Sequence, residues 1–233
     1  IPNYIIKKNL YKQLKKISNV TLITEAECSS INTEDQYASI KLSNGKKIQA
    51  SLVVAADSRF SKIRSKMGIS TFTRDFNKNM IVCRMQHEKS HKNIAYEFFR
   101  YNQTQATLPY IKNQSGIVTT ANKNLTADLM KMSNKAFNKE MESSFNNFFG
   151  KMKLVGKRYY YPMITTYTKK FISDRFALLG DAAVGMHPVT AHGFNLGLKG
   201  IEILTKVIKD ALKNKMNIGS LKVLNEYQFK LHR

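Results

Sequence analysis

The most informative segment of this chain is residues 176–200, which read Phe-Ala-Leu-Leu-Gly-Asp-Ala-Ala-Val-Gly-Met-His-Pro-Val-Thr-Ala-His-Gly-Phe-Asn-Leu-Gly-Leu-Lys-Gly. The apolar run at 176–179 predicts a buried strand that ends at Gly180 and delivers the Asp181 carboxylate to the edge of a sheet. A turn rich in Gly and Asn follows, and an apolar helix is expected from about Phe194. Free N–H groups and the helix dipole at such a junction suit a polar cofactor.

The order of residues in this segment also resembles that of one known family. Leu-Leu-Gly-Asp-Ala-Ala is followed by Pro188, and then by Gly193-Phe194-Asn195-Leu196-Gly197. This order resembles the flavin-contacting segment of the FAD-dependent aromatic hydroxylases, which share the p-hydroxybenzoate hydroxylase fold. The alternative for this segment alone is a strand–loop–helix unit that binds nothing.

A second segment resembles another motif of the same family. Residues 51–64 read Ser-Leu-Val-Val-Ala-Ala-Asp-Ser-Arg-Phe-Ser-Lys-Ile-Arg, where the family has an apolar strand followed by Ala-Asp-Gly-x-x-Ser-x-x-Arg. Asp57, Ser61 and Arg64 keep their places, whereas Ala55 and Ser58 stand where the family has Gly. Since Gly permits close backbone approach to a phosphate, these departures weigh against tight pyrophosphate contact. Taken alone, the segment predicts a parallel strand at 52–56 with Asp57 as a helix cap.

A third stretch resembles a subfamily. Residues 91–99 read His-Lys-Asn-Ile-Ala-Tyr-Glu-Phe-Phe, and Thr-Leu-Pro-Tyr follows at 107–110. This pattern resembles the substrate-domain sheet of the ubiquinone-biosynthesis hydroxylases. The alternative is a pair of hairpin strands with one exposed His.

The resemblance implies a fold of the α/β class (α+β mixed). We expect a partial FAD/NAD(P)-binding three-layer domain, formed by residues 1–69 and 164–233, with an inserted β-rich substrate domain at 70–163. Members of the family begin with a dinucleotide-binding β-α-β unit that carries Gly-x-Gly-x-x-Gly, a motif that this sequence does not contain. The chain is therefore expected to enter the family partway through.

Periodicity places the remaining elements. Apolar spacing predicts helices at 4–17, 125–149, 194–214 and 220–232, and a short strand at 20–24. Asn44-Gly45 predicts a hairpin turn. Further strands are expected at 80–85, 95–101, 106–111, 116–121 and 157–163.

The chain has 38 Lys and Arg against 16 Asp and Glu, a formal net charge of +22. Because most of the basic residues are Lys spread over the whole chain, nucleic-acid binding is not expected, whereas attraction to an anionic membrane surface is.

Cys28 and Cys83 give neither a metal-ligand spacing nor a disulfide framework, so we expect no metal site and a reducing compartment. The sequence shows no signal peptide and no apolar run that could cross a bilayer. We expect a cytoplasmic protein, at most peripheral on the inner membrane.

The resemblance assigns roles to residues near the expected flavin. Asp181 would accept a hydrogen bond from the ribityl chain of FAD, and Pro188 would shape the loop beside the reactive edge of the isoalloxazine. The first turn of the helix would offer N–H groups where negative charge builds on the reduced ring. The alternatives are a helix-capping Asp, a turn Pro and an ordinary N-cap. The expected cofactor-binding residues are Asp57, Arg64, Asp181, Ala182, Pro188, Gly193, Phe194 and Asn195.

No catalytic residue follows with certainty from the sequence. The candidates are His192 and Pro188, because imidazole titrates near neutral pH and the proline borders the expected ring. His187 is a weaker candidate, and each His could equally be a structural hydrogen-bond donor. Arg59 and Arg64 would face the pyrophosphate or NAD(P)H, or lie on the surface.

The resemblance implies a flavin-dependent monooxygenase that hydroxylates an aromatic ring, a polyprenyl phenol of ubiquinone biosynthesis, with FAD, NAD(P)H and O2. The fragment by itself is not expected to carry the whole activity. The expected partners are a quinone-type small molecule and other proteins of the ubiquinone pathway. The alternatives are another enzyme of the same fold, such as a prenyl reductase, a truncated accessory subunit without catalysis, or a basic binding module.

Overall fold

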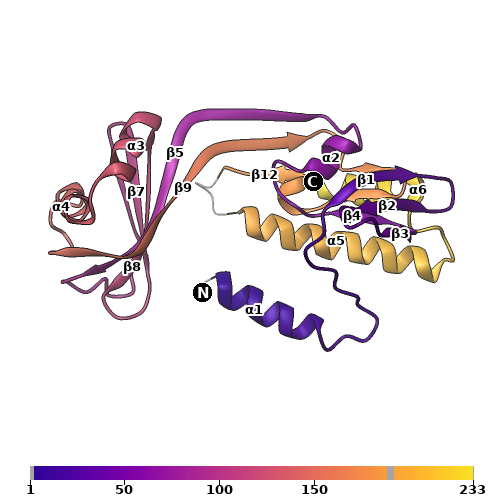
Figure 1. Ribbon diagram of the computed structural model, residues 1–233, viewed down its shortest axis with the longest axis horizontal. Helices are drawn as coiled ribbons and strands as arrows, with labels where there is room; N and C mark the ends of the chain where they lie inside the picture. Colours follow the sequence, from indigo (N-terminus) through magenta and orange to yellow (C-terminus); the bar gives the residue numbers. More distant parts are fainter. Residues whose placement is uncertain (1–2, 188–191, 233) are drawn as a thin grey trace.

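The computed structural model describes residues 3–187 and 192–232 of the chain. Two long antiparallel strands, β5 (Thr71–His87) and β9 (Met152–Thr168), run along the longest axis and join two lobes (Figure 1). One lobe carries most of a six-stranded sheet with helices α3 and α4. The other carries two three-stranded sheets and the C-terminal helices α5 and α6. The mixed helix-and-sheet fold expected from the sequence is confirmed.

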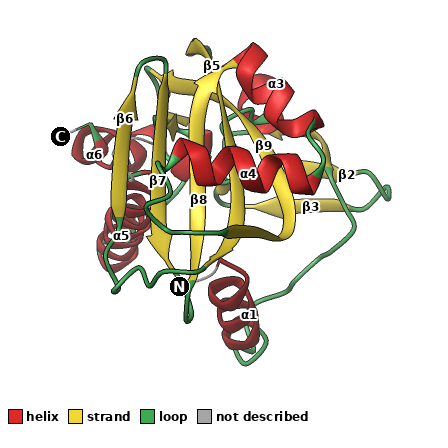
Figure 2. Ribbon diagram, turned by 90° about the vertical axis from the view of Figure 1, so that its left-hand side faces the viewer, coloured by secondary structure: helices red, strands yellow, loops and turns green. Residues whose placement is uncertain are grey.

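The six-stranded sheet is antiparallel throughout and is covered on one face. Its order is β12-β9-β5-β8-β7-β6. Helices α3 and α4 cross one face (Figure 2) and bury a core that includes Ile81, Met85, Ile117, Phe137 and Met141. The elements not yet bounded are β6 (Tyr96–Arg100), β7 (Gln103–Pro109), β8 (Gln114–Asn122), α3 (Lys123–Lys131), α4 (Asn134–Ser144) and β12 (Val184–Gly185).

The other lobe is built around a short parallel pair. Strand β4 (Val53–Ala55) runs parallel to β11 (Phe176–Leu178), which also pairs with β10 (Ile172–Ser173). A hairpin sheet of β1 (Cys28–Thr33), β2 (Ala38–Leu42) and β3 (Lys47–Ala50) lies beside it. The helices of this lobe are α2 (Lys62–Lys66), α5 (Gly193–Lys213) and α6 (Leu221–Leu231), whereas α1 (Asn3–Leu14) buries no residue and stands apart (Figure 1). The core joins β11 to α5 and α6 through the buried Phe176, Leu204, Val207, Leu224 and Tyr227.

Most of the expected elements are present, and local chemistry explains them. The parallel strand expected at 52–56 is β4, and the hairpin turn at Asn44-Gly45 joins β2 to β3. Gly45 has φ +84°, a conformation that favours glycine, and the Asn44 side chain accepts a hydrogen bond from the Lys46 N–H at 3.1 Å.

Two expectations were wrong. Residues 20–24 form no strand, and Val20, Leu22 and Ile23 are exposed because no neighbouring strand pairs with them. The helix expected at 125–149 is two helices, because the hydroxyl of Ser133 accepts a hydrogen bond from the Ala136 N–H and begins α4 separately from α3. The apolar spacing conceals this break, since both helices face the same core. Strand β1 was not expected.

The expected division into two domains places a boundary inside one continuous strand, β9. Strands β5 and β9 pair from Thr71–Thr168 at one end to His87–Met152 at the other. The expected boundary between residues 163 and 164 falls inside β9, so the two-domain division stays a prediction.

A buried arginine joins distant segments of the second lobe. Arg175 is 2% exposed, and its guanidinium donates to the carbonyl oxygens of Glu34 (2.8 Å), Ser51 (3.1 Å) and Asp35, and to Oδ1 of Asn217 (3.1 Å). A buried charge is tolerated only when it is well hydrogen-bonded, and here the acceptors are backbone and amide oxygens rather than a carboxylate.

Gly219 lies against this arginine, which makes it a test of the packing. A Cβ at Gly219 would overlap the Ser51 carbonyl oxygen and lie 2.9 Å from Arg175 Nη1. We expect Gly219→Ala to lower the free energy of unfolding in denaturant by about 1–3 kcal/mol. The control is Gly116→Ala, whose Cβ would meet nothing closer than 3.9 Å. An equal loss from both variants would contradict this account.

A second buried arginine ties α2 to the segment after β11. Arg64, 5% exposed, donates through Nη1 to the Ala182 carbonyl at 2.7 Å and through Nη2 to the Arg59 carbonyl at 3.0 Å. Burial lowers the pKa of Arg64, and the charge of Asp57 partly offsets this effect. These bonds hold the chain segment that follows β4 against the segment that follows β11.

Removing this arginine would leave both carbonyl oxygens without their donor. We expect Arg64→Ala to cost about 1–3 kcal/mol of unfolding free energy, measured by denaturant titration. Arg74→Ala is the matched control, because Arg74 is exposed and its guanidinium lies over the Phe76 ring, and it should change stability by about 0.5 kcal/mol or less. If Arg74→Ala lowered the free energy of unfolding as much as Arg64→Ala, the hydrogen bond from Arg64 to Ala182 would not explain the loss.

Candidate functional site

The site begins where the two parallel strands end. The N–H of Leu179 donates to the Ala55 carbonyl at 2.9 Å, which extends the pairing of β4 and β11 by one step. The chain then turns at Gly180, whose φ of +59° favours glycine, into the short 3₁₀ helix η1 (Gly180–Ala182). This turn places Asp181 at the carboxyl edge of the sheet, as the sequence predicted.

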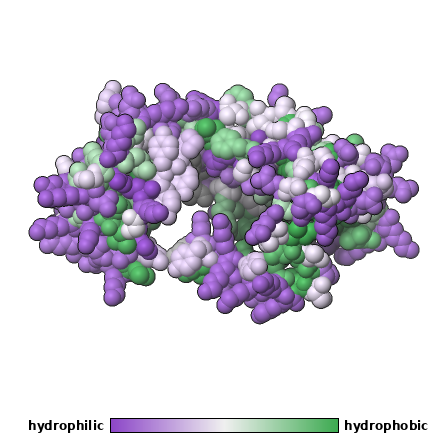
Figure 3. Space-filling view, in the orientation of Figure 1, coloured by the Kyte–Doolittle hydropathy of each residue, from purple (hydrophilic) through white to green (hydrophobic). Residues whose placement is uncertain are grey.

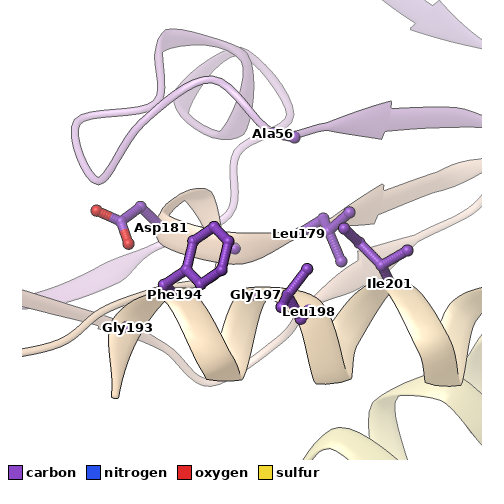
Figure 4. Close-up of a pocket in the computed structure, with 9 residues that line it drawn as sticks. Ala56, Leu179, Asp181, Gly193, Phe194, Gly197, Leu198 and Ile201 are labelled. Carbon is purple, nitrogen blue, oxygen red and sulfur yellow. The ribbon is translucent and has the colours of Figure 1, made fainter. Parts of the chain in front are cut away.

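Helix α5 approaches this edge closely and leaves a pocket of about 400 Å³ between them. Figure 4 shows Phe194 rising from the first turn of α5 beside Asp181, with apolar side chains further along the helix. A Cβ at Gly197 would lie 3.8 Å from the Gly180 Cα, at ordinary van der Waals distance, so this turn of α5 packs directly beside η1. The lining residues are Ala56, Leu179, Gly180, Asp181, Gly193, Phe194, Gly197, Leu198 and Ile201.

The pocket combines an apolar wall with a polar end. Leu179, Leu198 and Ile201 form the wall, and the Asp181 carboxylate lies at the opposite end with the N-terminus of α5 (Figure 4). His192, at the N-cap of α5, makes no side-chain hydrogen bond to the first turn. A helix N-terminus carries a partial positive charge. The arrangement can hold a flat apolar ring whose polar edge faces Asp181 and the helix end.

An ion pair that the sequence did not predict holds the polar end. Arg59 Nη2 lies 3.1 Å from Asp181 Oδ2, and Arg59 Nη1 donates to the Ile164 carbonyl at 2.7 Å. The Arg59 and Asp181 side chains are 28% and 41% exposed. The arginine therefore connects the loop after β4, the long strand β9 and the η1 turn. Arg59 was expected to face the pyrophosphate or NAD(P)H, or to lie on the surface, because spacing along the chain cannot reveal a partner 122 residues away.

The structure brings only some of the expected cofactor residues into the pocket. Asp181, Gly193 and Phe194 line it, whereas Ala182 is the buried last residue of η1 and Asn195 is exposed outside the lining. Asp57 is exposed just after β4, and Arg64 is buried with its guanidinium turned to backbone carbonyls. Pro188 lies outside the described residues. The cofactor roles of these residues stay predictions.

The two histidines lie in different surroundings. His192 is exposed at the start of α5, and its catalytic role stays a prediction. The ring of His187 stands edge-on to Phe76, with 4.7 Å between the ring centroids. Burial, reinforced by the charge of Lys78, lowers the pKa of His187, so this imidazole favours its neutral form.

Sequence reasoning missed part of the apolar wall. Gly197, Leu198 and Ile201 follow Gly193 and Phe194 by three to eight residues, the spacing that places side chains on one helix face. That signal was available. Leu179 and Ala56 depend on the parallel register, which no local pattern supplies.

The described residues offer neither a membrane-spanning helix nor a cluster of metal-binding side chains. No described helix is long and apolar enough to cross a membrane. Within residues 3–187 and 192–232, no group of three or more His, Cys, Asp or Glu side chains is arranged to hold a metal ion.

Curated proteins similar to this chain are named as ubiquinone-pathway enzymes. The chain is 38% identical over 230 residues to ubiquinone hydroxylase UbiM of Neisseria meningitidis, which covers 99% of this chain and 50% of that protein. It is 31% identical over 228 residues to ubiquinone hydroxylase UbiL of Rhodospirillum rubrum, covering 98% of this chain and 53% of that protein. The 3-demethoxyubiquinol 3-hydroxylase of Escherichia coli is 23% identical over 230 residues, covering 99% and 59%. The chain spans about half the length of the first two relatives.

Solved structures share the fold at low identity. PqsL of Pseudomonas aeruginosa, in complex with 2-aminobenzoylacetate, has a TM-score of 0.76 at 15% identity, covering 97% of this chain and 63% of that one. The tetrameric 2-methyl-3-hydroxypyridine-5-carboxylic acid oxygenase has a TM-score of 0.75 at 17% identity, covering 97% and 60%.

The sequence also matches one family over nearly its whole length. Residues 1–227 match the family described as the FAD binding domain. The two motifs on which the resemblance rests, at 51–64 and 176–200, both lie inside this match. The chain therefore belongs to the FAD binding domain family, as its resemblance to the FAD-dependent aromatic hydroxylases predicted.

Proposed function

We propose that this chain is part of a flavin-dependent monooxygenase that hydroxylates an aromatic ring of the quinone type, with FAD, NAD(P)H and O2. One observation carries the proposal: the pocket between η1 and α5 has an apolar wall, a carboxylate and a helix N-terminus at its polar end. The names of the similar proteins, ubiquinone hydroxylases and a 3-demethoxyubiquinol 3-hydroxylase, support the substrate class.

In this proposal the chain holds and orients the ring system. The Asp181 carboxylate accepts hydrogen bonds from hydroxyl groups of the cofactor chain, and Arg59 fixes its direction through Oδ2. The first turn of α5 stabilises negative charge at the edge of the ring that faces it. Leu179, Leu198 and Ile201 cover the apolar face and exclude water. Bound FAD would supply the redox and oxygen chemistry itself.

Flavin binding is the direct test of this proposal. The 233-residue chain would be titrated with FAD. A chimera in which this chain replaces the aligned 230 residues of the Neisseria meningitidis relative would be titrated beside it. Whichever of the two proteins binds FAD, we expect Asp181→Asn to raise its dissociation constant for FAD roughly tenfold, because one charge-assisted hydrogen bond is lost. Visible absorption and quenching of flavin fluorescence give the dissociation constant.

A matched substitution separates this effect from a change of net charge. Asp128→Asn, on the exposed surface of α3 in the other lobe, should leave FAD affinity unchanged. If neither the chain nor the chimera binds FAD, the proposal is wrong, and an accessory protein with the same fold but no catalytic activity becomes the better explanation. Equal affinities of the two variants would remove Asp181 from the cofactor site.

We further propose that the protein associates with anionic membrane surfaces. The net charge of +22 supports this, because basic surfaces are attracted to anionic lipid, and apolar quinones reside in membranes. We expect cosedimentation with vesicles that contain anionic phospholipid, and release at about 1 M salt, where charges are screened within about 3 Å. Vesicles of neutral phosphatidylcholine are the control, and equal binding to both would overturn the proposal.

A further inference from the structure

Two buried histidines face each other at the end of β5, in a part of the chain that the proposed function does not use. His87 is the last residue of β5 and is 2% exposed, and His91 lies in the loop before β6 and is 4% exposed. Their ring centroids are 5.6 Å apart, with one ring edge-on to the other. Both belong to the lobe of α3 and α4, whose surface is mostly hydrophilic in the view of Figure 3. Buried polar groups are more informative than polar groups on such a surface, so this pair calls for an explanation.

The hydrogen bonds of His87 fix the form of its ring. Nδ1 lies 2.6 Å from the Lys89 carbonyl oxygen, which can only accept, so Nδ1 carries a proton and donates. Nε2 lies 3.0 Å from Oγ of Ser115 on β8, and in the neutral ring it accepts from that hydroxyl. Because a serine hydroxyl can also accept, a protonated His87 would keep both partners.

His91, in contrast, loses its partner when it is protonated. Its Nδ1 accepts the N–H of Asn93 at 2.9 Å, so Nδ1 carries no proton and the ring hydrogen is on Nε2. Nε2 is buried and has no hydrogen-bond partner among the described residues. In an imidazolium both nitrogens carry a proton. Protonation of His91 would therefore set two N–H donors against each other at Nδ1, and it would bury a charge without an acceptor at Nε2.

The hydrogen bond from Asn93 closes a strained turn. Lys92 and Asn93 have φ of +50° and +59°, a left-handed backbone that costs free energy in residues other than glycine. The Lys92 N–H donates to Oγ of Ser90 at 3.1 Å, and the Ile94 N–H donates to the His91 carbonyl at 2.9 Å. Two of these three local bonds go to His91, so the turn depends on this residue more than on any other in the loop.

The surroundings of the pair offer no counter-ion for an imidazolium. The charged and titratable side chains on the neighbouring segments are Glu88, Lys89, Tyr96, Glu142 and Lys151. The Glu88 carboxylate accepts the Lys151 N–H at 3.0 Å, and the Glu142 carboxylate accepts the Met152 N–H at 2.8 Å. Within residues 3–187 and 192–232, neither histidine forms an ion pair.

The pKa of His87 indicates the direction in which pH acts on the pair. Burial lowers the pKa of His87, the hydrogen bond to the Lys89 carbonyl offsets part of this effect, and the charge of a protonated His91 would lower it further. An exposed imidazole takes up its proton at about pH 6.5. The closed form therefore binds fewer protons than an open one, so its stability is complete above about pH 6.5 and decreases as the pH falls below that value.

We propose that the His87–His91 pair is an acid-sensitive lock on the loop at 88–95. While both rings are neutral, His91 holds the turn at Lys92 and Asn93 closed, and uptake of a proton by His91 opens it. The loop also donates from the Glu88 N–H to the Lys151 carbonyl and from the Lys89 N–H to the Phe149 carbonyl, both at 3.0 Å. Opening would thus loosen the connection between the end of β5 and the segment before β9. This inference depends on neither FAD nor the proposed substrate.

Hydrogen exchange followed by mass spectrometry tests the lock on the folded chain at about pH 7.5 and about pH 5, after correction for the intrinsic effect of pH on exchange. We expect the protection of the peptide that covers 88–95 to fall roughly tenfold or more at the lower pH, because uptake of one proton favours opening by up to about tenfold per pH unit below about pH 6.5. Peptides of β8 and α3 should keep their protection. Unchanged protection of 88–95, or an equal loss in all peptides, would overturn the proposal.

Two substitutions separate the proton from the contact. His91→Asn offers an amide oxygen to the N–H two residues further on, as in an Asx turn, but cannot take up a proton, so the loop should stay protected at both pH values. His91→Ala removes the acceptor, and the loop should exchange faster at both. The control is His232→Asn, at the exposed end of α6 in the other lobe, which should respond to pH as the unsubstituted chain does. A pH response that survives in His91→Asn would rule out His91 as the sensor.

Nitrogen NMR of the imidazole rings supplies a test that needs no variant. At about pH 7.5 we expect Nδ1 of His91 to be unprotonated and Nδ1 of His87 to be protonated, as their hydrogen bonds require. A proton on Nδ1 of His91 at that pH would contradict the bond from Asn93 and overturn the lock.

Discussion

The parallel pairing of β4 with β11 is the constraint on which the site depends. It is only three residues long in each strand, yet it brings the segment after residue 55 beside the segment after residue 178. Parallel strands end at the same edge, so the Asp57 loop and the Asp181 turn meet there. The bonds from Arg64 to Ala182 and from Arg59 to Asp181 then fix one loop to the other. Without this register, neither the pocket nor its ion pair would form.

Strand β9 connects the pocket at η1 to the helices of the other lobe. Near one end, its Ile164 carbonyl accepts the hydrogen bond from Arg59 that orients the ion pair. Further along, residues 156–158 bulge opposite Cys83, and Arg158 donates to the Leu129 carbonyl of α3. Since β9 pairs with β5 along most of its length, these two contacts are joined by paired strands rather than by loops.

Local patterns in the sequence predicted the elements well, because each carries its own signal. The apolar run before Asp181, the Asn44-Gly45 turn and the spacing of α5 all identified their structures. The patterns failed where structure depends on a distant partner. Residues 20–24 are apolar but have no strand beside them, and the helix break at Ser133 is hidden by a continuous apolar stripe. The partners of Arg59, Arg64 and Arg175 all lie on other segments, so no spacing revealed them.

For the site too, features that depend on order along the chain were predicted, and features that depend on the whole fold were not. Resemblance placed Asp181, Gly193 and Phe194 at the pocket, since these positions depend on order along the chain. It did not distinguish the exposed Asp57 from the buried Arg64, because burial is a property of the whole fold.

The surroundings of Arg175 bear on how the protein responds to its solvent. A chain with a net charge of +22 repels itself at its surface, and dissolved ions weaken that repulsion. Arg175 is enclosed by carbonyl and amide oxygens and is almost fully removed from water, so those ions cannot reach it. Raising the ionic strength thus relieves a cost at the surface without weakening the buried contact. The exposed charges of this protein and the buried guanidinium of Arg175 therefore respond to salt in different ways.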